Sequence, residues 1–238
     1  MNTLTNKKIH HIHIPKTGGS YLRNSFLIPF FDKTINAGEY YEMNLGTDEV
    51  HHCWPAEDKG SYLVSSFRDP MKRTVSHYCE MFDFPRFEIK PNIYDFRKWV
   101  ESNANYLSNF QSKNFIYSFK EGDDEKGDRF FYKLSGFLNI NNVEINDVKE
   151  KINRLNIFIR NTQMTENNMI ALSKKIVDDL KSKINFNFFQ PLSVNNISND
   201  SLDLYSMLTQ DDIAYLYELN SVDNELFLND SLFWNNGK

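Results

Sequence analysis

Near the N-terminus, an alternating apolar segment runs directly into a turn that contains two adjacent glycines, HIHIPKTGGSYL (residues 11–22). The alternation of isoleucines with histidines predicts a strand over residues 9–14. Ser20 is a typical N-cap residue, and the apolar residues after it predict a helix to about residue 27. A strand, a glycine turn and a helix in this order are typical of an α/β protein that binds phosphate.

Length and composition indicate a globular protein with a single domain over residues 1–238. Hydrophobic residues make up 40% of the chain and aromatic residues 15%, which is enough for a sizeable core. The net charge of -5 argues against a nonspecific nucleic-acid binder. The two cysteines, Cys53 and Cys79, are expected to be reduced thiols. No segment has the length of a membrane span or a signal peptide, so a cytoplasmic protein is expected.

Two further apolar segments predict core strands, SYLVSSF at residues 61–67 and NIFIRN at residues 156–161. Asp69 and Pro70 are typical of the N-cap and first position of a helix, which is predicted to extend to about residue 82. Other helices are predicted at residues 94–119 (two helices), 143–155, 166–182 and 209–219, and irregular structure at residues 32–60, 121–128 and 195–201. Strands that alternate with helices predict an α/β fold with a mostly parallel sheet.

The turn PKTGGS is the first candidate anion site. Gly18 and Gly19 let the backbone approach a ligand closely, Lys16 supplies an ammonium group, and Thr17 and Ser20 supply hydroxyl donors. The turn differs from a Walker A loop, because His10 and Pro15 stand where that loop has glycines. An ordinary strand–helix turn with a surface lysine is the alternative.

The segment SSFRDPMKRTVSHY (residues 65–78) is the second candidate. Arg68 follows a predicted central strand, at the edge where open α/β sheets bind ligands. Ser76 lies about two helical turns further on, so Arg68 and Ser76 are placed to hold a second anion. The alternative is a structural ion pair between Arg68 and Asp69 or another carboxylate.

Together these two motifs resemble the sulfotransferase family that uses 3′-phosphoadenylyl sulfate (PAPS), and most of all the carbohydrate O-sulfotransferases related to the uronyl 2-O-sulfotransferases. The resemblance implies a P-loop-like three-layer fold with a central, mostly parallel sheet flanked by helices. It also implies that the 5′-phosphosulfate of PAPS is held by the turn at Lys16, Thr17, Gly18, Gly19, Ser20 and Tyr21. Arg68 and Ser76 would hold the 3′-phosphate, and no metal would be required.

Four other segments resemble parts of the same family more loosely. NFQSK (residues 109–113) is similar to an Asn-x-Gln-[Thr/Ser]-Arg segment, with Lys113 in place of arginine. QMTE (residues 163–166) is similar to a Gly-Leu-Thr-Glu turn without the glycine, and SVDNELF (residues 221–227) to a closing Asp-x-x-Leu-Tyr segment. PLSVNN (residues 191–196) stands where the family has a loop over the nucleotide, which implies contacts from Ser193 and Asn195.

Sulfuryl transfer needs a cation at the leaving phosphate and a base at the acceptor hydroxyl. Lys16 is expected to stabilise the charge on the leaving oxygen. The resemblance places the catalytic base at His52, with the adjacent His51 as the alternative. Glu39 and Glu42 are further candidate bases.

His11 and His13 are interpreted as structural residues of the sheet, and no metal site is predicted because no Cys, His or Glu cluster accompanies them. The expected reaction moves a sulfuryl group from PAPS to a hydroxyl acceptor and releases adenosine 3′,5′-bisphosphate. The net acidic chain favours a neutral or lightly charged glycan, or another hydroxyl-bearing small molecule, as that acceptor. Two alternatives stay open: a nucleotide or small-molecule kinase with a degenerate phosphate loop, and a non-catalytic nucleotide- or glycan-binding module. The sequence does not indicate an oligomeric state.

Overall fold

The structure is a computed structural model that describes residues 9–22, 34–36, 62–82, 92–117, 137, 140–180 and 199–234. Its strands are β1 (Ile9–Ile12), β2 (Thr34–Asn36), β3 (Tyr62–Phe67) and β4 (Ile157–Arg160). The helices are α1 (Gly19–Leu22), α2 (Pro70–Phe82), α3 (Ile93–Ser102), α4 (Ala104–Leu107), α5 (Phe110–Ile116), α7 (Ile145–Asn153), α8 (Glu166–Leu180), α9 (Asn199–Ser206), α10 (Gln210–Leu219) and α11 (Ser221–Leu228). Short 3₁₀ turns lie at Asn161–Gln163 and Asp230–Leu232.

The described strands form a small open sheet in the order β2-β1-β3-β4, and every pairing is parallel. Side chains on both faces of β3 are buried, as expected for a parallel strand with helices on each side. The predicted α/β class with a parallel sheet is therefore confirmed.

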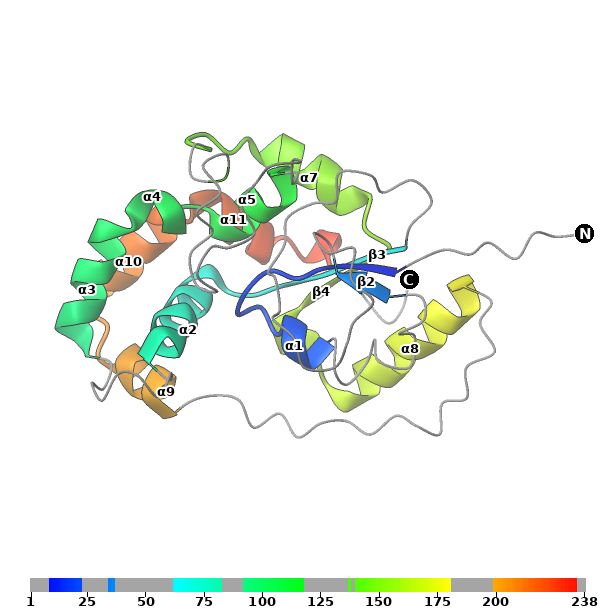
Figure 1. The fold of residues 1–238 in the computed structure, drawn as a ribbon, viewed down its shortest axis with the longest axis horizontal. Helices are drawn as coiled ribbons and strands as arrows, with labels where there is room; N and C mark the ends of the chain where they lie inside the picture. Colours follow the sequence, from blue (N-terminus) through cyan, green and yellow to red (C-terminus); the bar gives the residue numbers. More distant parts are fainter. Residues whose placement is uncertain are drawn as a thin grey trace, which may run out of the picture.

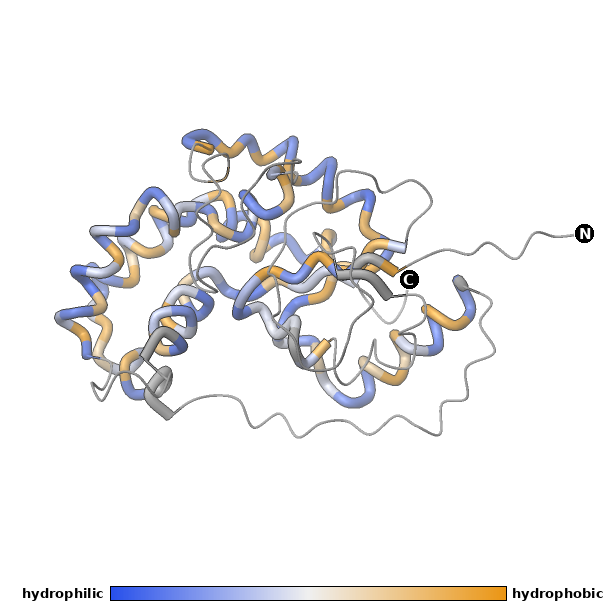
Figure 2. The backbone as a smooth tube through the Cα atoms, viewed as in Figure 1, coloured by the Kyte–Doolittle hydropathy of each residue, from blue (hydrophilic) through white to orange (hydrophobic). Residues whose placement is uncertain are grey.

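Helices cover both faces of this sheet (Figure 1). Leu63 and Phe67 of β3 pack in a large cluster with α2, α5, α7 and α11, whereas Val64 packs with Ile159 of β4 and with α8. Figure 2 shows apolar and polar residues alternating along the helices, as expected for helices with one face against a core. The helices α2, α3, α9 and α10 continue beyond the end at which β3 finishes (Figure 1).

Helix α2 begins as the sequence predicts. The Oδ1 atom of Asp69 accepts a hydrogen bond from the backbone N–H of Lys72 at 2.9 Å, and Pro70 is the first helical residue. An N-cap carboxylate satisfies one of the free N–H groups of the first turn, and proline has no N–H to leave unpaired. The start of α2 directly after β3 fixes where Arg68 leaves the sheet.

Several predicted boundaries are wrong. β2 lies inside the segment predicted to be irregular, because three residues that pair with β1 are too few to give a periodic pattern. α9 begins at Asn199, inside a predicted polar loop, since Asn, Asp and Ser are also favoured at helix N-termini. The aromatic segment forms three helices rather than two, because Asn109 adopts a left-handed conformation (φ 45°) between α4 and α5.

β1 ends at Ile12 and not at residue 14, because the chain turns after the last register pair with β3. The predicted continuation of α1 and the loop at residues 121–128 lie outside the described residues. Among the described helices, none has the length and hydropathy needed to span a bilayer.

Candidate functional site

The strand order places a topological switch point between β1 and β3. The chain passes from β1 to β2 on one side and then crosses to β3 on the other side, and open α/β sheets bind ligands at the carboxyl ends of such a strand pair. Ile12 pairs with Ser65, so the turn that starts at Pro15 and the residue Arg68 leave the sheet at the same edge. The two sequence motifs are therefore brought together.

The turn after β1 is anchored to β3 by Thr17. Its Oγ1 atom donates to the carbonyl of Ile14 at 2.8 Å and shares a hydrogen bond of 2.8 Å with Oγ of Ser66. Thr17 is fully buried, and both of these hydrogen bonds of its hydroxyl are made within the protein. Its predicted contact with a ligand stays a prediction. The turn presents its backbone and the side chain of Lys16 at the edge of the sheet.

Close packing makes both glycines of the turn necessary. Gly18 has φ +90°, and a Cβ there would lie 2.6 Å from Nδ2 of Asn161, directly after β4. A Cβ at Gly19 would lie 2.0 Å from Cδ2 of His13. The ring of His13 stacks on that of His11, with centroids 5.2 Å apart, and both rings are buried. The two histidines thus lie beneath the turn.

Arg68 links the two motifs directly. Its Nη1 atom donates to the carbonyl of Lys16 at 3.1 Å. Its Nε is buried and has no hydrogen-bond partner among the described residues. Burial lowers the pKa of this guanidinium, and the neighbouring charge of Asp69 raises it. No ion pair joins Arg68 to Asp69 among the described residues, where the Asp69 carboxylate caps α2 and accepts a hydrogen bond from the hydroxyl of Tyr217 at 3.2 Å.

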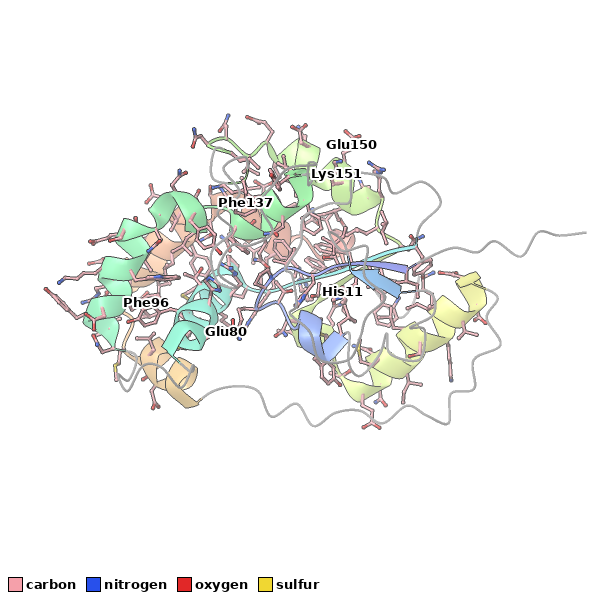
Figure 3. The ribbon with its side chains drawn as sticks, in the orientation of Figure 1. His11, Glu80, Phe96, Phe137, Glu150 and Lys151 are labelled. Atoms are coloured by element: carbon pink, nitrogen blue, oxygen red, sulfur yellow. The ribbon has the colours of Figure 1, made fainter. Side chains whose placement is uncertain are left out.

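One face of α2 lies against the turn. Nε of Arg73 donates to the carbonyl of Pro15 at 3.3 Å, and Nζ of Lys16 forms an ion pair with Oε1 of Glu80 at 3.1 Å. Ser76 is three residues after Arg73 and four before Glu80, so it shares their face of the helix. Ser76 is partly exposed, and its hydroxyl makes no hydrogen bond within the described residues. Figure 3 shows Glu80 on the side of α2 that faces the turn.

Two residues of this arrangement were not predicted from the sequence. Glu80 holds the ammonium of Lys16, and Gln111 of α5 hydrogen-bonds to the backbone of Arg68 through both ends of its amide. In the sequence, Gln111 belongs to the NFQSK segment (residues 109–113). No periodicity or spacing signals a contact between residues 43 positions apart.

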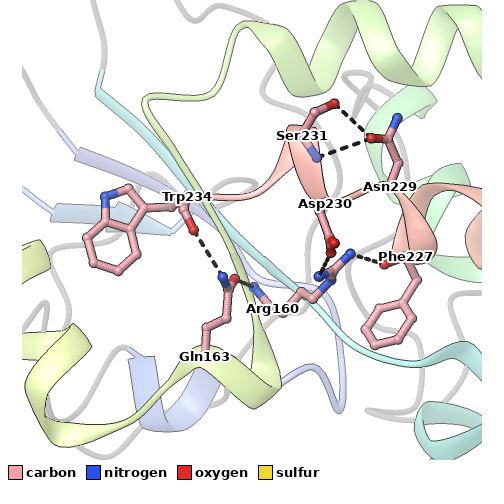
Figure 4. A network of polar contacts seen from close by, with 7 residues as sticks. All are labelled: Arg160, Gln163, Phe227, Asn229, Asp230, Ser231 and Trp234. Atoms are coloured by element: carbon pink, nitrogen blue, oxygen red, sulfur yellow. Dashed lines mark hydrogen bonds and ion pairs between the residues drawn. The ribbon is translucent and has the colours of Figure 1, made fainter. Parts of the chain in front are cut away.

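A second arginine lies at the carboxyl edge of the sheet, at the end of β4 (Figure 4), and both of its Nη atoms are paired within the protein, whereas its buried Nε has no hydrogen-bond partner among the described residues. Arg160 pairs with Asp230, donates to the carbonyl of Phe227, and lies over the ring of Phe233 at 4.2 Å from the centroid. It ties β4 to the C-terminal segment. The contrast with Arg68 is clear, because no carboxylate of the described residues pairs with Arg68.

Other predicted site residues lie outside the part of the chain that the structure describes: His51, His52, Ser193, Asn195, Glu39 and Glu42. Ser20 belongs to α1, but the placement of its side chain is not described. Tyr21 is partly buried on α1, and burial together with the charge of Glu166 raises the pKa of its hydroxyl. Within the described ranges, the assembled site consists of the turn, Arg68 and the α2 face that carries Ser76.

Comparison of the chain with protein-family models, with curated proteins and with solved structures gives no match.

The contact between Gly19 and His13 predicts the outcome of one substitution. Gly19→Ala should lower the free energy of unfolding by about 2 kcal/mol or more, because the added methyl group overlaps the buried imidazole. Urea denaturation measures the change. The double variant His13→Ala/Gly19→Ala is the control, since removal of the ring should make the two losses less than additive. A single variant as stable as the wild type would contradict the packing described.

Proposed function

We propose that the protein is a PAPS-dependent O-sulfotransferase with a P-loop-like nucleotide site, and that its acceptor is a carbohydrate hydroxyl. The observation that carries the proposal is Arg68, a partly buried arginine at the switch point. It lies against the Lys16 turn and has no carboxylate partner among the described residues. A guanidinium at such an edge matches a phosphate that accepts two parallel hydrogen bonds.

Two candidate anion-binding groups that follow different strands match a nucleotide with phosphates at both the 5′ and the 3′ positions of its ribose. Lys16 and the glycine backbone lie after β1, whereas Arg68 lies after β3 and Ser76 on α2. PAPS carries a 5′-phosphosulfate and a 3′-phosphate, so one group of residues would receive each. ATP offers only the 5′ chain and would leave Arg68 without a phosphate partner.

The transfer step uses Lys16 and a base from the segment between the two motifs. The acceptor oxygen attacks sulfur, and the bond from sulfur to the bridging oxygen of the 5′-phosphate breaks with its electron pair on that oxygen. Lys16 stabilises this developing charge, and the proton of the acceptor passes to His52. The products are the sulfate ester and adenosine 3′,5′-bisphosphate.

Nucleotide binding by isothermal titration calorimetry tests the proposal. We expect the wild type to bind adenosine 3′,5′-bisphosphate more tightly than ATP or adenosine 5′-phosphate. Arg68→Ala should weaken bisphosphate binding about 30-fold and Ser76→Ala about fivefold, because each loses a hydrogen bond to a phosphate. Binding of adenosine 5′-phosphate should change less than about twofold in both variants.

Lys98→Ala, which removes an exposed cation from α3, is the charge-matched control and should leave both affinities unchanged. Tighter binding of ATP than of the bisphosphate would overturn the proposal in favour of a kinase. If Arg68→Ala weakened the affinity for the bisphosphate and for adenosine 5′-phosphate equally, Arg68 would not be the residue that binds the 3′-phosphate.

The ion pair between Lys16 and Glu80 gives a second prediction. The Glu80 carboxylate pairs with the Lys16 ammonium and so competes with the 5′-phosphate for it. Glu80→Gln should therefore tighten binding of adenosine 3′,5′-bisphosphate by about threefold. Glu101→Gln on α3 is the matched control for the loss of one exposed carboxylate. Weaker binding in the Glu80 variant would mean that Glu80 holds Lys16 in its binding position instead of competing for it.

The assignment of the base predicts a separation of binding from transfer. His52→Ala should reduce transfer of radiolabelled sulfate from PAPS by at least about 100-fold, since general-base catalysis contributes that much, and should leave bisphosphate affinity unchanged. His51→Ala is the paired control and should keep most of the activity. A normal rate in the His52 variant would exclude this residue, and no transfer by the wild type to any glycan, lipid or phenol would favour a binding module.

A further inference from the structure

The backbone of Arg68 is held by a single side chain from a distant helix. Oε1 of Gln111 accepts from the Arg68 N–H at 2.9 Å, and Nε2 of Gln111 donates to the Arg68 carbonyl at 2.8 Å. The parallel pairing of β3 with β4 ends at Phe67, so Arg68 is the first residue beyond it. The amide of Gln111 supplies both hydrogen bonds that a continuing strand would otherwise make.

Gln111 is itself fixed from the C-terminal part of the chain. The carboxylate of Asp223 in α11 accepts from the backbone N–H groups of Gln111 at 3.0 Å and of Ser112 at 2.8 Å, in the first turn of α5. In return, Oδ1 of Asn109 accepts from the N–H groups of Val222 at 2.9 Å and Asp223 at 3.3 Å. Each helix start therefore receives a cap from the other element.

Three of these residues lie in the protein interior. Gln111 and Ser112 are fully buried and Asp223 is 1% exposed. Burial raises the pKa of Asp223, whereas the hydrogen bonds from Ser112 and Gln111 and the charge of Arg73 lower it. A buried amide that lost one partner would pay a desolvation penalty, so Gln111 has little freedom to leave this position.

We propose that Gln111 is a positioning residue that sets the direction of the Arg68 guanidinium, and that Asp223 holds Gln111 in place. Two hydrogen bonds to one residue restrict its backbone dihedrals, and the backbone determines where the side chain leaves the chain. Arg68 also donates a hydrogen bond from its guanidinium to the carbonyl of Lys16 at 3.1 Å. Residues 109–113 and 221–223 would thus control the anion site without touching the ligand. The identity of the anion rests on the proposed function.

The test compares Gln111→Met with Asn114→Leu in the full chain. Both changes replace a fully buried amide of α5 by an apolar residue of similar size, but Asn114 hydrogen-bonds to the carbonyl of Phe110 and not to Arg68. Two quantities are measured in each variant: the amide hydrogen-exchange rate of Arg68 by NMR without ligand, and the dissociation constant of adenosine 3′,5′-bisphosphate. Urea denaturation reports any general loss of stability.

We expect Gln111→Met to raise the Arg68 exchange rate and the dissociation constant each about tenfold more than Asn114→Leu does. Equal effects of the two variants would overturn the proposal, because they would show a purely structural role. Faster exchange with unchanged binding would overturn it as well. If the wild type does not bind the bisphosphate, the proposed function fails, whereas the exchange rates still decide whether Gln111 holds Arg68.

Discussion

The parallel pairing of β1 with β3 is the contact on which both the core and the candidate site depend. It brings Ile12 opposite Ser65, and the hydroxyl of Ser65 strengthens the join by donating to the carbonyl of Ile12 at 2.8 Å. Just beyond this pair, the hydroxyl of Thr17 shares a hydrogen bond with the hydroxyl of Ser66. Because parallel strands end at a common edge, this pairing places a lysine-bearing turn and an arginine side by side.

Polar contacts extend from that edge to the C-terminal part of the chain. Arg68 contacts the turn, Gln111 holds the backbone of Arg68, and Asp223 caps the helix that carries Gln111. Arg160 makes a parallel connection from β4 to Asp230. The two connections differ in one respect that bears on function, because the Arg160 guanidinium pairs with the carboxylate of Asp230, whereas the Arg68 guanidinium donates only to a carbonyl among the described residues. A partly buried cation without a carboxylate partner among the described residues favours an anionic ligand.

Local patterns predicted the elements well wherever the periodicity was long or the cap was distinctive. The strand at residues 62–67 and the helix from Pro70 to Phe82 both follow from apolar runs and from the Asp-Pro pair. β2 and α9 were missed for the opposite reason, since a three-residue edge strand and a polar helix start carry no distinctive pattern. For the candidate site, the sequence singled out Lys16, the glycines, Arg68 and Ser76, and the fold places all of them at one edge. The inward direction of Thr17 and the pairing of Glu80 with Lys16 were not predictable, because each depends on which neighbour the folded chain brings near.

The sequence by itself determined an α/β chain with two anion-binding candidates and the order in which they follow the strands. Such properties depend on residue types within a few positions of each other, where caps, turns and alternation act. Only the tertiary structure decided that Arg68 touches the carbonyl of Lys16, 52 residues earlier, and that its backbone is held by Gln111, 43 residues later. Contacts at such separations depend on how helices and strands pack around a shared core, and packing is a property of the whole fold.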